Sequence, residues 1–132
     1  MIKTGPKTST FFALSTAAFV SGLNVRLFDS LLPTVADNCL VEPTRAAVVV
    51  TAFTLAYGIF QLVFGPLGDR FGKLRIIAGA ALAAALGSLG SGFAPSLSSL
   101  AWLRFATGIG AAAIFPISLI WLGENSLFED RQ

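Results

Sequence analysis

Four long apolar stretches alternate with short polar segments along the 132-residue chain. Each stretch is close to the roughly 20 residues that a helix needs to cross a hydrocarbon core of about 30 Å. The pattern therefore predicts an all-α polytopic membrane protein with four transmembrane helices, preceded by a polar N-terminal segment, residues 1–10. The predicted helices cover residues 11–36, 46–64, 76–94 and 100–122.

The composition supports this prediction and excludes several kinds of site. Hydrophobic residues make up 55% of the chain and charged residues only 12%, about half the share that is usual in soluble domains. The chain has no His and one Cys, Cys39, which argues against a disulfide framework, a His-ligated metal site and a His-dependent nucleophile. We therefore expect no metal, no cofactor and no enzymatic activity.

The basic residues predict the orientation in the membrane. Only Arg45 lies in the segments on one side, whereas six Lys and Arg residues lie in the segments on the other. The positive-inside rule then places both termini and the segment 65–75 in the cytoplasm. The net charge of +2 is thus a signal of topology, and no nucleic-acid partner is expected. The six residues are Lys3, Lys7, Arg70, Lys73, Arg75 and Arg131.

The N-terminal segment also fits a second interpretation. Lys3 and Lys7 precede an apolar run, as in a signal peptide that would be cleaved near Ser21 or Gly22. The apolar run continues past these positions and three further spans follow, so a first transmembrane helix is favoured.

The stretch Gly65-Pro-Leu-Gly-Asp-Arg-Phe-Gly-Lys-Leu-Arg75 is the most informative part of the chain. Pro66 is expected to disrupt the end of the second helix, because proline lacks a backbone N–H. Asp69 is expected to cap the next helix, since a helix N-terminus favours a negative group. Gly72 supplies a backbone that is free to turn. A positively charged cytoplasmic turn would require neither the acid nor the glycines.

This stretch resembles the signature loop of the major facilitator superfamily (MFS), G-x-L-A-D-R-x-G-R-K, between its second and third helices. The match includes Gly65, Asp69, Arg70 and Gly72, with Lys73 in place of Arg, whereas Gly68 and Leu74 depart from the pattern. The resemblance implies a cytoplasmic gate in which the acid interacts with the opposite half of a transporter. Glu124 follows the fourth span. It is interpreted either as a partner of the gate that lies near Arg70 and Lys73 or as part of a solvated polar tail.

A second stretch, residues 100–112, resembles the fourth-helix pattern L-x-x-x-R-x-x-Q-G-x-G-A-A of the same superfamily, with Thr107 in place of Gln. The resemblance implies a role in proton coupling for Arg104. Gly108 and Gly110 also fit a dinucleotide fingerprint, G-x-G-x-x-A, but that motif requires a preceding strand, and here it lies inside a helical span.

Charged residues inside the first span indicate a polar cavity. Arg26 and Asp29 fall on one helical stripe, and charges on a membrane helix must face protein or water. Counting along the helices places Asp29 and Arg104 both roughly 10 Å below the outer surface, which allows an Asp29–Arg104 contact. The three charges are interpreted either as a substrate or proton-coupling site or as interhelical ion pairs.

Small residues predict close helix packing in the third and fourth spans. Gly79, Ala83, Gly87 and Ser91 recur at intervals of four, and Gly108 belongs to the fourth-helix motif.

The resemblance covers nearly the whole chain and implies one-third of a twelve-helix transporter. Residues 11–132 are then a partial MFS domain that supplies helices 1–4, in a bacterial inner membrane. It implies proton-linked efflux of a small-molecule substrate by alternating access, together with the missing helices. Two alternatives stay open: a four-helix small multidrug exporter that acts as a dimer, and a non-transporting membrane fragment or assembly subunit.

Overall fold

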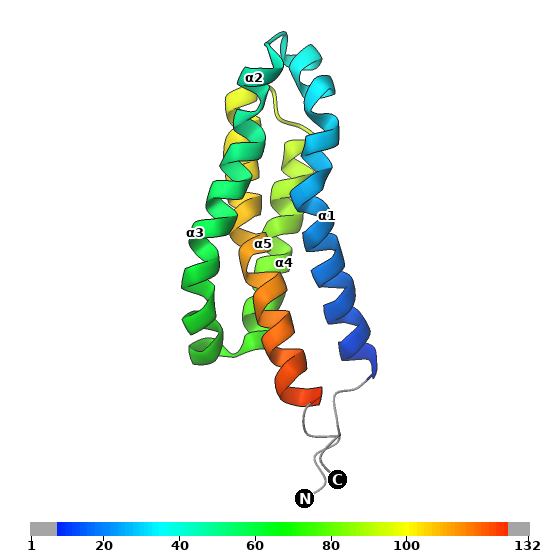
Figure 1. Cartoon of the computed structure of the whole chain (residues 1–132), viewed down its shortest axis with the longest axis vertical. Helices are drawn as coiled ribbons and strands as arrows, with labels where there is room; N and C mark the ends of the chain where they lie inside the picture. Colours follow the sequence, from blue (N-terminus) through cyan, green and yellow to red (C-terminus); the bar gives the residue numbers. More distant parts are fainter. Residues whose placement is uncertain (1–7, 127–132) are drawn as a thin grey trace, which may run out of the picture.

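A computed structural model describes residues 8–126 of the chain as a bundle of long helices (Figure 1). Four helical segments are long and apolar enough to cross a membrane, and α2 and α3 together form one of them, Pro43–Phe71. The predicted all-α fold with four membrane-spanning helices is therefore confirmed. The helices are α1 (Thr8–Cys39), α2 (Pro43–Ala46), α3 (Val48–Phe71), α4 (Lys73–Ser91) and α5 (Leu97–Ser126). Lys3, Lys7 and Arg131, on which the predicted orientation partly depends, lie outside the described residues.

The predicted loop between the second and third spans is almost entirely helical. α3 continues through Pro66 to Phe71, and α4 begins at Lys73. The expectation that Pro66 disrupts the helix is wrong: proline removes one helical hydrogen bond, which transmembrane helices tolerate. Gly72 alone separates the two helices, with φ of 93°, a conformation that favours glycine.

The other helix ends also differ from the predicted spans. α1 extends beyond 11–36 at both ends, and α4 ends at Ser91, three residues before the predicted end. The predicted polar link 37–45 contains most of the one-turn helix α2, which starts with Pro43 at a position where a missing N–H costs no helical bond.

α5 is the central helix of the bundle. It packs most extensively against α3 and α4, and it also contacts α1. In its most apolar 18-residue window 50% of the residues are buried, against 11% in α1. Figure 1 shows that α1 begins, α5 ends and α3 turns into α4 at the same end of the bundle.

Two glycines of α5 allow close approach to two different neighbours. A Cβ at Gly108 would lie 2.5 Å from the carbonyl oxygen of Phe53 on α3, and one at Gly110 would lie 2.7 Å from that of Ala80 on α4. Residues two apart on a helix point in nearly opposite directions, about 200° apart. The Gly-Ile-Gly sequence therefore packs one glycine against each neighbouring helix.

The small residues of α4 pack only in part as predicted. A Cβ at Gly87 would collide with Thr107 Oγ1 on α5, whereas no atom of the described chain lies near one at Gly79. Within the described residues, Gly79 therefore makes no close helix contact of the predicted kind. The buried positions are spaced by three and four residues, as a 3.6-residue period requires, so a strict interval of four drifts away from the contact. These positions are Ile77, Ala80, Ala84 and Gly87.

Candidate functional site

Arg104 is the largest fully buried side chain of the described residues, with 1% of its surface exposed. Its guanidinium hydrogen-bonds one residue of α1, Asn24. Nη1 donates to Asn24 Oδ1 at 3.0 Å, and Nη2 donates to the main-chain carbonyl of Asn24 at 3.0 Å. These two bonds tie the central helix to α1.

Two aromatic rings cover the same guanidinium. Its Cζ lies 4.1 Å from the ring centroid of Phe28 on α1 and 4.1 Å from that of Phe53 on α3. A guanidinium over an aromatic face is attracted by the ring quadrupole, and the attraction grows when the pair is desolvated. Among the described residues, Nε of Arg104 has no hydrogen-bond partner. The positive charge of α5 is therefore surrounded by neutral groups of two other helices, α1 and α3.

Asp29 does not contact Arg104, so the allowed Asp29–Arg104 pair is not formed. Asp29 Oδ2 lies 3.5 Å from Nη1 of Arg26, in an ion pair along α1. The reason is helix rotation: at about 100° per residue, Arg26 and Asp29 point away from the face on which Asn24 and Phe28 meet Arg104. The predicted contact therefore fails on the direction of the Asp29 side chain.

The Arg26–Asp29 pair lies on the outer face of α1. The two side chains are 85% and 45% exposed, in the middle of an otherwise apolar helix. Charged groups at membrane depth are costly unless they face water or other protein. This face of α1 is therefore unsuited to lipid.

Lys73 joins the ends of three helices at the α3–α4 turn. Its Nζ lies 2.5 Å from Oε1 of Glu124 on α5 and 3.3 Å from Oδ1 of Asp69 on α3. The structure thus brings Glu124 to Lys73. Asp69 does not cap α4 as expected, because α3 continues past it and Gly72 occupies the N-cap without a side-chain bond. The Asp69 side chain remains 71% exposed.

Sequence reasoning missed the residues that surround Arg104. Asn24 is a strongly polar residue inside an apolar run, and Phe28 follows it by one helical turn, on the same face. An amide in a membrane span commonly hydrogen-bonds another helix, so Asn24 carried a usable signal. Phe53 gave no such signal in the sequence, because phenylalanine is common in apolar membrane spans.

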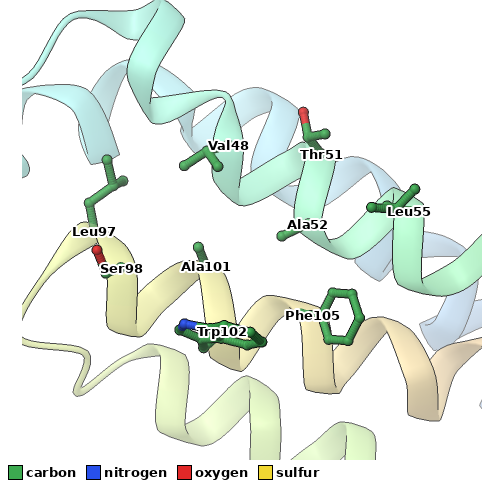
Figure 2. A pocket seen from close by; sticks show the side chains of 9 residues that line it. All are labelled: Val48, Thr51, Ala52, Leu55, Leu97, Ser98, Ala101, Trp102 and Phe105. Atoms are coloured by element: carbon green, nitrogen blue, oxygen red, sulfur yellow. The ribbon is translucent and has the colours of Figure 1, made fainter.

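An apolar cleft of about 470 Å³ separates α3 and α5 near the α2 end of the bundle. Figure 2 shows Ala52 of α3 and Ala101 of α5 pointing toward one another across it. Trp102 lines the cleft with 73% of its surface exposed, and no charged residue takes part. The cleft suits an apolar neighbour and contains none of the predicted site residues. Residues 8–126 also contain no group of three or more His, Cys, Asp or Glu that could hold a metal.

Comparison with known proteins identifies relatives of the chain. It is 30% identical over 98 residues to an uncharacterized MFS-type transporter, YceJ of Bacillus subtilis, over 74% of this chain and 25% of the relative. It is 37% identical over 99 residues to the puromycin resistance protein pur8 of Streptomyces alboniger, over 75% of this chain and 19% of the relative. It is 30% identical over 113 residues to the multidrug export protein EmrB of Escherichia coli, over 86% of this chain and 22% of the relative.

The chain thus spans between 19% and 25% of the length of these curated relatives. No solved structure matches it. The sequence profile of one transporter family matches residues 14–132, which include every described element except the start of α1. With four membrane-spanning helices and this match, the chain belongs to the Major Facilitator Superfamily.

Proposed function

We propose that the chain forms the first four helices of a proton-coupled efflux transporter for a small solute, in a bacterial inner membrane with both termini cytoplasmic. The further helices of the transporter and the lipid bilayer are its partners. The exposed Arg26–Asp29 pair on α1 is the observation that carries this proposal. A helix that is apolar enough to span a membrane has a charged face that requires water or protein beside it.

In this proposal Asp29 carries the coupled proton. Its carboxylate is 45% exposed and has one weak ion partner, Arg26 at 3.5 Å, so water and a solute can reach it. Proton relays in membrane transporters commonly use such an intramembrane acid.

Arg104 takes a different part. Its side chain is 1% exposed, two rings lie close to the guanidinium and two of its nitrogens bind Asn24, which leaves little surface for a substrate. Arg104 therefore acts on coupling by holding α1 against α5 and α3, so that the face bearing Asp29 keeps its direction.

The cytoplasmic gate comprises the α3–α4 turn and the end of α5. Lys73 holds Asp69 and Glu124 together, and the exposed Asp69 is available to the other half of the transporter. The remaining gate residues are Gly65, Arg70 and Gly72. Two relatives, a puromycin resistance protein and a multidrug export protein, support export as the direction of transport.

The experiment is gradient-driven uptake of puromycin into everted membrane vesicles that contain a complete transporter carrying this sequence. Asp29→Asn is expected to abolish uptake driven by a pH gradient while membrane insertion stays normal. Asp37→Asn is the matched control, because Asp37 lies on the same helix beyond the apolar stretch. Unchanged pH-driven uptake in Asp29→Asn would contradict the proposal.

A second assay separates the alternatives. The 132-residue chain alone is expected to insert into vesicles without moving puromycin. Saturable, gradient-driven uptake by the chain alone, lost in Asp29→Asn, would favour the four-helix exporter acting as a dimer.

A further inference from the structure

A cleft of about 520 Å³ opens at the α3–α4 turn and is lined by cationic and aromatic side chains. Arg70, Lys73 and Arg75 contribute the charges, and Trp121 of α5 closes one side. Basic pockets between transmembrane helices at a membrane surface suit the head groups of anionic lipids. We propose that this cleft binds the phosphate of an anionic phospholipid, which goes beyond the gate role proposed above for Arg70, Gly72 and Lys73.

The three cationic side chains of the cleft differ in whether a carboxylate of the described chain pairs with them. Lys73 is 15% exposed and already bridges Asp69 and Glu124. Arg70 and Arg75 are exposed, and no carboxylate among residues 8–124 lies within ion-pair distance of either. Asp69 and Glu124 both lie beside Lys73, and the guanidinium forks of Arg70 and Arg75 are well matched to a phosphate.

The cleft lies at the ends of helices that are long and apolar enough to cross a membrane, where lipid head groups are expected. α3 ends at Phe71 and α4 begins at Lys73, so Arg70 and Arg75 lie at this end of the two helices. Trp121 lies three residues before Glu124, where the span of α5 ends. Tryptophan side chains are enriched at this interfacial level.

Apolar side chains beside the arginines favour a lipid over a free phosphate. Phe71 is 57% exposed and Leu74 is 44% exposed, and both line the cleft. A phosphate on Arg70 and Arg75 would leave these two surfaces for acyl chains. A soluble phosphate would leave them uncovered.

The test uses the full 132-residue chain with Trp102→Phe, which leaves Trp121 as the sole tryptophan. The chain is placed in phosphatidylcholine nanodiscs that contain a small fraction of brominated phosphatidylglycerol or brominated phosphatidylcholine. Brominated phosphatidylglycerol is expected to quench Trp121 fluorescence more strongly, through local enrichment. Each arginine removed is expected to lower that enrichment by about fivefold, so Arg70→Gln with Arg75→Gln brings it close to the phosphatidylcholine value.

Arg45→Gln, at the opposite end of the bundle, is the matched control and is expected to leave the enrichment unchanged. If the double variant loses helicity, a sodium chloride titration of the parent chain takes the place of that experiment. The lipid enrichment is then expected to fall as the salt concentration rises, because salt screens the attraction between the arginines and the phosphate. Equal quenching by the two lipids, or enrichment that survives the double variant or high salt, would overturn the proposal. Inorganic phosphate that removes the enrichment more effectively than sodium chloride at equal ionic strength would assign the cleft to a free phosphate and overturn it as well.

Discussion

Arg104 of α5 binds Asn24 of α1 at both its side chain and its backbone, with the two guanidinium nitrogens each 3.0 Å from an oxygen of that residue. The bond crosses the bundle between segments 80 positions apart in the sequence. One acceptor is the backbone carbonyl of Asn24 and the other is its side chain. The arginine contact therefore depends on the position of the α1 backbone as well as on the residue type at position 24.

Replacement of Asn24 tests the first of these two bonds. Asn24→Ala removes the acceptor of Nη1 and leaves a buried charged donor unpaired, at an expected cost of about 1–2 kcal/mol of stability. Ser30→Ala, on the exposed part of α1, is expected to change stability little. Reversible unfolding in mixed micelles, followed by helicity, measures both. Equal stability of the two variants would refute the importance of the contact.

The rings of Phe28 and Phe53 beside Arg104 predict that another positively charged side chain cannot replace its guanidinium. Arg104→Lys keeps the positive charge but loses the planar fork and its contacts with the rings of Phe28 and Phe53, so a loss of about 2 kcal/mol is expected. Arg26→Lys is the control, since that side chain is 85% exposed. The same unfolding assay measures both variants. An Arg104→Lys chain as stable as the parent chain would contradict a stabilising role for the ring contacts.

The glycine contacts predict opposite effects at two positions. Gly108→Ala places a Cβ 2.5 Å from the Phe53 carbonyl oxygen, so α3 must move and a loss of about 1–3 kcal/mol is expected. Gly79→Ala meets no described atom and is expected to gain about 0.5–1 kcal/mol, because alanine favours a helix. Unfolding of the two variants side by side gives the comparison, and a loss at Gly79 as large as that at Gly108 would be inconsistent with the packing described.

The Lys73 bridge predicts an order of effects at the α3–α4 turn. Glu124→Gln is expected to lower the midpoint of thermal unfolding more than Asp69→Asn, because Glu124 is closer to Lys73 and ties in α5, whereas Asp69 is only four residues away from Lys73 along the chain. The difference is expected to shrink in high salt, which screens exposed pairs. The reverse order would show that Asp69 holds the turn.

The fold was predictable from the sequence because its signals are local. Four apolar stretches of membrane length became four spanning helices, and Gly72 was predicted as the turning residue. The ends of the helices were harder to place. Polar residues such as Asp69 and Arg70 were predicted to lie in a loop. In the structure they belong to α3, which continues about two turns beyond the apolar stretch.

The candidate site was predictable only in part. Counting residues placed Asp29 and Arg104 at similar depth, because the rise per residue is fixed. Which side of α1 faces α5 depends on packing between helices, and that rotation brought Asn24 and Phe28 to Arg104 and turned Arg26 and Asp29 outward. Gly79 belongs to the same stripe as Gly87, which meets α5, but no atom of the described chain lies near its Cβ position, so the stripe of small residues did not predict which of its members make the contact.

The central claim is that the outer face of α1 lines an aqueous path in the complete transporter. The direct measurement is labelling of single cysteines by a charged, membrane-impermeant thiol reagent, in a Cys39→Ser background. Ser30→Cys lies on the face of Arg26, whereas Leu82→Cys lies on α4 at an apolar position that is 63% exposed. The account predicts rapid labelling of Ser30→Cys and none of Leu82→Cys; labelling of Ser30→Cys no faster than that of Leu82→Cys would contradict it.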